Sequence, residues 1–107
     1  MLSLSELQKQ QKEWADHNFP TRKNYQPLLG VIEEVGELAH AHLKQEQGIR
    51  GTKEEFEHKK KDAVGDVIVF LADYCTLNNL NLQQCLEDAW AEVKQRDWRK
   101  NETKNVQ

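Results

Sequence analysis

The sequence predicts an all-α protein, and three observations support this fold class. Apolar residues recur at helical spacing through most of the 107-residue chain, and no stretch shows the alternation typical of a strand. Ser3 with Glu6 and Thr52 with Glu55 have the spacing of capping boxes, which mark the starts of helices. Two glycines separate the two longest helical stretches, which indicates a tight turn and therefore a helical hairpin.

The first half of the chain predicts two helices joined by a loop. The first helix begins after Ser3 and ends near Asp16, and residues 17–26 show little periodicity and form the loop. Pro27 suits the first turn of a helix because its missing N–H would have no partner there. The second helix therefore runs from Pro27 to about Gln47.

The second half predicts the return of the hairpin and one further helix. Gly48 and Gly51 form the turn, and a third helix begins after Thr52 and reaches Leu77. Asn81 with Gln84 caps a fourth helix. The apolar face of this helix consists of Leu82, Cys85, Leu86, Ala89, Trp90 and Val93. We expect residues 103–107 to be disordered.

The length and composition of the chain limit the classes of protein to which it can belong. A chain of 107 residues supports one domain, residues 1–107, with a modest core that self-association would enlarge. The net charge of −3 excludes a generally basic surface for a nucleic-acid polymer. No apolar run approaches a membrane span, and the N-terminus has no signal-peptide pattern, so we expect a soluble cytoplasmic protein. Cys75 and Cys85 are then expected to be reduced core thiols.

Two clusters of carboxylates lie on the predicted hairpin, Glu33, Glu34 and Glu37 on one helix and Asp62 and Asp66 on the other. If the hairpin folds about a midpoint between Ile49 and Arg50, residues whose numbers sum to about 99 lie level with one another. Glu37 then lies level with Asp62, and Glu33 with Asp66.

Carboxylates at one height of a hairpin repel one another unless protons or cations neutralise them. On the helical wheel, Glu34 and Glu37 fall at the margin of an apolar arc, where unpaired acids are costly. That arc consists of Leu28, Val31, Val35, Leu38 and Ala39. Oxygen ligands without cysteine favour Mg²⁺ or Mn²⁺ over zinc. The sequence therefore predicts a divalent metal site.

The motif Ile32-Glu33-Glu34-Val35-Gly36-Glu37-Leu38, followed by Asp66-Val67-Ile68, resembles the signature of the MazG-like, all-α nucleoside triphosphate pyrophosphohydrolases. The resemblance covers the second and third helices closely and the rest in outline. It implies a four-helix MazG-like bundle built on a long antiparallel hairpin and completed in dimers or tetramers. It also implies Mg²⁺-dependent hydrolysis of a (deoxy)nucleoside triphosphate to monophosphate and pyrophosphate, in nucleotide-pool house-cleaning.

Carried over residue by residue, Glu34, Glu37 and Asp66 match ligand positions of that family, and Glu33 matches the first acid of its signature. The chain departs from the family pattern at Ala63, where the family has glutamate. Asp62 stands one helical turn before Asp66 and is the expected replacement ligand. This departure concerns the number of metal ions more than the class of reaction.

The resemblance also implies roles in the reaction. We expect water to attack the α-phosphorus with Glu34 or Glu37 as base. Lys94 and Arg96 are candidates for the outer phosphates, or else form a solvated helix terminus. Trp14 is a candidate for stacking on the base, or else closes the core above the second helix. Asn78 contacts the base edge or sugar, or serves only as a helix C-cap.

Two other classes of protein are alternatives to a pyrophosphohydrolase. The spacings Glu37-x-x-His40 and Glu55-x-x-His58 occur in di-iron bundles. The helical wheel turns His40 away from Glu34, and the hairpin register sets Glu55 level with Lys44, far from Glu37. A non-catalytic helical module, whose carboxylates bind a basic partner or residues 59–61 of a neighbouring chain, is the alternative to an enzyme.

Overall fold

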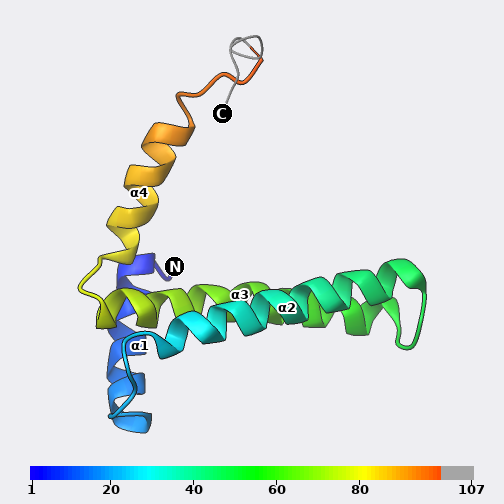
Figure 1. The fold of residues 1–107 in the computed structure, drawn as a ribbon, viewed down its shortest axis with the longest axis horizontal. Helices are drawn as coiled ribbons and strands as arrows, with labels where there is room; N and C mark the ends of the chain where they lie inside the picture. The colour runs from blue at the N-terminus through cyan, green and yellow to red at the C-terminus, as the bar shows by residue number, and fades with distance from the viewer. Residues whose placement is uncertain (100–107) are drawn as a thin grey trace.

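A computed structural model describes residues 1–99, which contain four helices and no strand (Figure 1). The helices are α1 (Leu4–Asn18), α2 (Gln26–Gln47), α3 (Lys53–Leu77) and α4 (Leu82–Val93). The all-α class is confirmed for this part of the chain. The expectation of disorder concerned residues 103–107, which lie outside the described residues.

The helices begin at the predicted caps. The Ser3 hydroxyl accepts a hydrogen bond from the Glu6 amide at 3.1 Å, and the Glu6 carboxylate accepts one from the Ser3 amide at 2.8 Å. Thr52 and Glu55 form the same reciprocal pair at the start of α3. The Asn81 side chain accepts from the Gln84 amide at 2.9 Å and caps α4. These caps satisfy amides that have no partner inside a helix.

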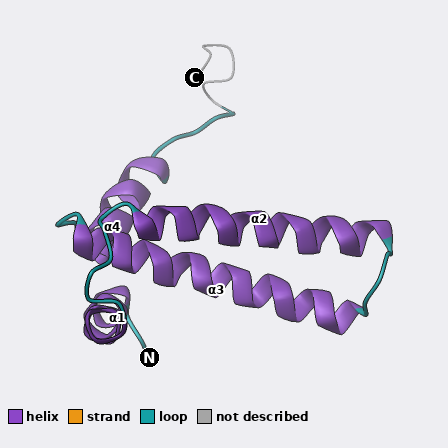
Figure 2. Cartoon of the chain, turned by 60° about the horizontal axis from the view of Figure 1, so that its bottom comes forward, coloured by secondary structure: helices purple, strands orange, loops and turns teal. Residues whose placement is uncertain are grey.

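Helices α2 and α3 run antiparallel along most of the molecule (Figure 2). The turn between them contains three residues with positive φ, Gly48 at 66°, Arg50 at 49° and Gly51 at 100°. Glycine adopts such angles without steric cost, and this explains why two glycines punctuate the connection.

Two contacts define the register of the hairpin. Gly30 of α2 lies so close to Phe70 of α3 that a Cβ on the glycine would come within 2.5 Å of the ring. Four residues further along α2, Glu34 lies near enough to Asp66 of α3 for that acid to contribute to its raised pKa. In both pairs the residue numbers sum to 100, close to the predicted value of about 99. Asp66 of α3 therefore lies beside Glu34, one residue beyond Glu33, which the predicted midpoint set level with it.

A buried ion pair fixes the loop after α1 to α3. The Arg22 guanidinium donates to both Asp73 carboxylate oxygens at 2.8–3.0 Å, and the two side chains are only 9% and 7% exposed. Arg22 also donates to the Phe19 carbonyl at 3.1 Å. Removing one partner of such a pair costs about 3 to 5 kcal/mol, because the other charge stays buried. The pair holds α1 across α3 at the end of the hairpin away from the turn (Figure 1).

Hydrogen bonds from α1 attach the N-terminal end of helix α4. The Gln8 side chain of α1 donates to the Leu80 carbonyl at 2.9 Å and accepts from the Leu82 amide at 2.8 Å. Beyond this junction α4 extends away from the hairpin (Figure 1). One chain is thus more open than the four-helix bundle expected from the resemblance. No helix within residues 1–99 has the combination of length and apolar character needed to cross a bilayer.

The core of the single chain is small. Its buried apolar residues are Ala15, Ala41, Phe56, Ala63, Ala72 and Cys75. The radius of gyration is 17.4 Å, where a compact chain of this length would have about 13 Å. Two apolar faces predicted from the sequence, on α2 and α4, are largely exposed in the described part of the single chain. Leu28 and Val35 of α2 and Leu86, Trp90 and Val93 of α4 are exposed. Of the two expected core thiols, Cys75 is buried, whereas Cys85 of α4 is exposed, so that prediction is wrong for Cys85.

We predict that Gly30→Ala destabilises the protein by about 1 to 3 kcal/mol, because the new methyl group must displace the Phe70 ring. Gly36→Ala is the matched control on the same helix, since nothing lies within 4 Å of its added Cβ. That variant should gain about 0.5 to 1 kcal/mol from helix propensity. Urea unfolding followed by circular dichroism measures both. Equal effects of the two substitutions would contradict the close approach of the helices.

Candidate functional site

The first carboxylate cluster is brought together by helix geometry. Glu33, Glu34 and Glu37 lie in the second and third turns of α2, where residues three and four apart are neighbours. One carboxylate oxygen from each side chain can be chosen so that all lie within 4.8 Å of one another. This spacing suits oxygen ligands of one divalent cation.

The surroundings of Glu34 disfavour its charged form. Its side chain is half-buried, and desolvation is the main cause that raises its pKa above the usual value. The negative charges of Glu37, Asp66 and Glu33 raise the pKa further. The ionised form of Glu34 is therefore disfavoured until a proton or a cation compensates it.

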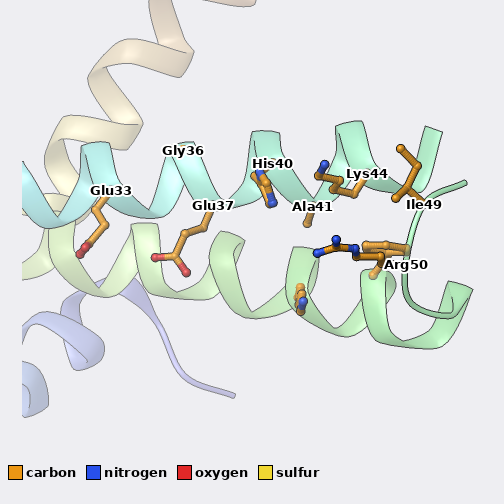
Figure 3. A pocket seen from close by; sticks show the side chains of 10 residues that line it. Glu33, Gly36, Glu37, His40, Ala41, Lys44, Ile49 and Arg50 are labelled. Carbon is orange, nitrogen blue, oxygen red and sulfur yellow. The ribbon is translucent and has the colours of Figure 1, made fainter. Parts of the chain in front are cut away.

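A groove of about 530 Å³ begins at this cluster and runs along the hairpin toward its turn (Figure 3). Glu33 and Glu37 line one end, and Lys44 and Arg50 line the end beside the turn. Lys59 of α3 also lines it, and Ala41 and Phe56 contribute apolar surface. The groove thus places carboxylates and cations in one continuous surface.

The three cations of the groove are available to a ligand. Within residues 1–99, Lys44, Arg50 and Lys59 form no salt bridge, whereas neighbouring Lys60 pairs with Glu57 at 2.6 Å. Arg50 extends its guanidinium into the groove from the turn (Figure 3). The sequence hypothesis did not assign these residues to the site. The hairpin register contained the signal, because Lys44 and Lys59 fall within about one turn of the same level.

The two acids of the second predicted cluster, Asp62 and Asp66, have different surroundings in the structure. Asp66 lies near the Glu34 carboxylate, whereas Asp62 is 70% exposed and lies 3.6 Å from His58 on its own helix. Ala63, at the position where the resemblance implies a glutamate, is buried and 3% exposed. The structure brings together Glu33, Glu34, Glu37 and Asp66, and it does not place Asp62 among the groups that act on Glu34.

The predicted substrate-binding residues lie away from this groove in the single chain. Lys94 follows the end of α4, and Arg96 pairs with Glu92 at 2.9 Å and lies over the Trp98 ring. Trp14 is exposed and packs edge-on against Phe19, so it does not close a core above α2. Asn78 occupies the C-cap of α3 and donates to the Asn24 and Tyr74 carbonyls.

The histidine spacings weighed for a di-iron site do not converge. His40 lines the groove next to Glu37, but Glu55 accepts a hydrogen bond from the Thr52 amide at the start of α3. His58 faces Asp62 on its own helix instead of the α2 carboxylates. The second Glu-x-x-His pair is therefore engaged near the turn, away from the first.

Comparisons of the chain with models of protein families, with curated proteins and with solved structures yield no match. The assignment of a function therefore depends on the geometry and charge of the site.

We predict that Glu34→Gln changes how stability depends on pH. A raised pKa in the folded state means that the unfolded chain releases this proton first. The wild type should therefore lose stability relative to Glu34→Gln as pH rises from about 4.5, and the difference should level off above the folded pKa. Urea unfolding without divalent cations measures this difference.

Glu46→Gln removes a carboxylate from the same helix outside the groove and controls for the altered helix charge. A constant difference between the wild type and Glu34→Gln across this pH range would contradict the electrostatic strain assigned to Glu34.

Proposed function

We propose that this protein is a Mg²⁺-dependent nucleoside triphosphate pyrophosphohydrolase of the MazG-like class, which releases a nucleoside monophosphate and pyrophosphate. The observation that carries the proposal is the groove that joins the α2 carboxylates to three unpaired cations. A polyphosphate chelated to a divalent metal needs both kinds of group, because the ion binds carboxylates and the remaining phosphate charge binds lysine and arginine.

The residues suit a hard divalent cation. Glu33, Glu34 and Glu37 offer oxygen atoms within reach of one ion, and Asp66 adds a fourth carboxylate beside Glu34. The raised pKa of Glu34 supports this assignment, because a cation would relieve the repulsion that causes part of the shift. When bound, Mg²⁺ or Mn²⁺ would neutralise the phosphate charge and polarise the phosphoryl oxygens.

Side chains that line the groove or lie beside it supply the rest of the chemistry. A carboxylate oxygen of Glu34 or Glu37 accepts a proton from the attacking water. Lys44, Arg50 and Lys59 hold the outer phosphates and stabilise charge on the departing pyrophosphate. Asp66 lies beside Glu34. The apolar surface of Ala41 and Phe56 reduces the access of water to the phosphate chain.

A second copy of the chain completes this site in our proposal, in a dimer or tetramer. Trp90 of α4 is 58% exposed, and Leu86 and Val93 lie on the same stripe. The exposed stripe of α2 offers an apolar surface of the same kind. Docking α4 of one copy onto the hairpin of another would bury both stripes and would bring Lys94 and Arg96 toward a groove.

The exposed stripes also favour the alternative, a non-catalytic helical module. In that case the apolar faces and the Glu33–Glu37 cluster together bind a basic amphipathic partner. The two proposals differ in whether nucleotides are turned over.

We expect the purified protein to convert at least one nucleoside triphosphate, with Mg²⁺ or Mn²⁺, to monophosphate and pyrophosphate. A panel of canonical and modified ribo- and deoxynucleotides, analysed by chromatography, measures this. Glu37→Gln and Asp66→Asn should each reduce kcat/KM more than about 100-fold, because even indirect partners of metal ligands contribute 10- to 100-fold. Release of orthophosphate, or no turnover of any nucleotide, would contradict the proposal.

Matched variants test whether a lysine inside the groove contributes more to substrate binding than a lysine outside it. Lys59→Ala should raise KM about tenfold through loss of a charged contact, whereas Lys61→Ala, on the same helix but outside the groove, should not. Glu46→Gln should leave activity unchanged. Circular dichroism checks that each variant stays folded. Equal effects of the two lysine variants on KM would show that the groove does not bind the phosphates.

We expect the protein to be larger than a monomer at about micromolar concentration by light scattering, as buried apolar stripes would require. Trp90→Glu should shift it to a monomer, because a charge would then face an apolar partner surface. Ala91→Glu adds the same charge on another face of α4 and should leave the assembly intact. A wild-type monomer would contradict the shared site.

A further inference from the structure

The two ends of the groove carry opposite charge. Glu33 and Glu37 line the end at the carboxylate cluster, and Lys44, Arg50 and Lys59 line the end beside the turn (Figure 3). Glu37 and Lys44 are seven residues apart on α2, which is about 10 Å along the helix axis. A ligand that spans the groove therefore meets the carboxylates and the cations with different parts of its structure.

The three cations come from three parts of the chain. Lys44 belongs to α2, Arg50 to the turn and Lys59 to α3. The register in which paired residue numbers sum to 100 sets Lys44 level with Phe56 and Lys59 level with Ala41, so the two lysines lie within about one helical turn of each other. The hairpin thus holds three positive charges around one end of the groove.

The acids near the turn do not line this end of the groove. Glu55 accepts a hydrogen bond from the backbone at the start of α3, and Glu57 pairs with Lys60 at 2.6 Å. Glu46 and Glu54 line two other depressions of the surface. Among the described residues, the turn end of the groove is therefore lined by cations without a carboxylate beside them.

We propose that Lys44, Arg50 and Lys59 bind inorganic pyrophosphate, and that pyrophosphate is the last product to leave and a competitive inhibitor. The order of release rests on the proposed function, whereas binding of pyrophosphate to the free protein does not require turnover. Arginine forms paired hydrogen bonds to phosphate oxygens, and lysine binds phosphate as a point charge. Pyrophosphate is a compact polyanion with acceptor oxygens on both phosphorus atoms, and it therefore suits several converging cations.

The separation of charge determines the order of release. In the proposed reaction water adds to the α-phosphorus, and the bond from this phosphorus to the α–β bridging oxygen breaks. The monophosphate then lies at the carboxylates and the pyrophosphate lies at the cations. The four acids of the site, when ionised, carry four negative charges, and one divalent cation balances half of them. The remaining charge repels the monophosphate, whereas the cations retain the pyrophosphate.

Retained pyrophosphate occupies the place of the outer phosphates and excludes the next triphosphate. Sustained turnover therefore requires a separate reaction that consumes pyrophosphate. Addition of water to pyrophosphate breaks its P–O–P bond and gives two orthophosphates. Each orthophosphate carries less charge and reaches fewer cations at once, so it binds more weakly.

Calorimetric titration of the full chain with pyrophosphate tests the site without nucleotide or metal, in buffer freed of metal ions by a chelating resin. The wild type should bind pyrophosphate more tightly than orthophosphate. Lys59→Ala should weaken binding of pyrophosphate about tenfold through loss of one charged contact. Lys61→Ala, on the same helix but outside the groove, should bind as the wild type does. Absence of binding, or equal losses in the two variants, would overturn the proposed site.

Product inhibition tests the order of release, with Mg²⁺ in excess and a triphosphate that the protein turns over. Pyrophosphate should compete with the triphosphate, whereas the monophosphate should inhibit noncompetitively, because it binds the complex that still holds pyrophosphate. The opposite pattern would overturn the order. A protein without turnover would contradict the proposed function and with it the order of release, while calorimetry would still decide whether the groove binds pyrophosphate.

Discussion

The candidate site depends on how closely α2 approaches α3. At Gly30 the absence of a side chain lets the Phe70 ring lie against the α2 backbone, and the gap would not accept a methyl group. Glu34 lies one turn further on, opposite Asp66, and the groove continues to the turn. A shift of α2 by one residue against α3 would rotate the α2 carboxylates by about 100° and turn Glu34 away from Asp66. Packing at one glycine thus affects the electrostatics of a carboxylate one turn away.

The rest of the single chain is held by polar contacts more than by a large core. Arg22 and Asp73 tie the loop after α1 to α3, and Gln8 ties α1 to the start of α4. These directional contacts place the helices, but they do not cover the apolar faces of α2 and α4. These two apolar faces are open to solvent in the single chain. We interpret them as the surfaces through which copies of the chain assemble.

Local signals made the helices and the hairpin predictable, whereas contacts across the chain were not. The caps at Ser3 and Thr52 follow from short spacings. The two glycines of the turn gave the hairpin register to within one residue, since Glu33 was predicted level with Asp66 and Glu34 is the residue found beside it. The pairing of Arg22 with Asp73 has no local signature, because it joins a loop to a distant helix. Lys44, Arg50 and Lys59 were missed although the hairpin register places Lys44 and Lys59 near the same level, because the register was applied only to the carboxylates. The helical wheel marked apolar faces correctly but could not tell burial within a chain from burial between chains.

Arg50 is a bulky residue in a left-handed conformation, where glycine would serve without strain. Such a conformation costs on the order of 1 kcal/mol and persists only where the surroundings enforce it. Glycine at this position would relax the turn, yet it would also remove a positive charge from the wall of the groove. The turn of the hairpin thus keeps a strained residue that supplies a positive charge to the groove. Selection for thermal stability alone would favour glycine in place of this arginine.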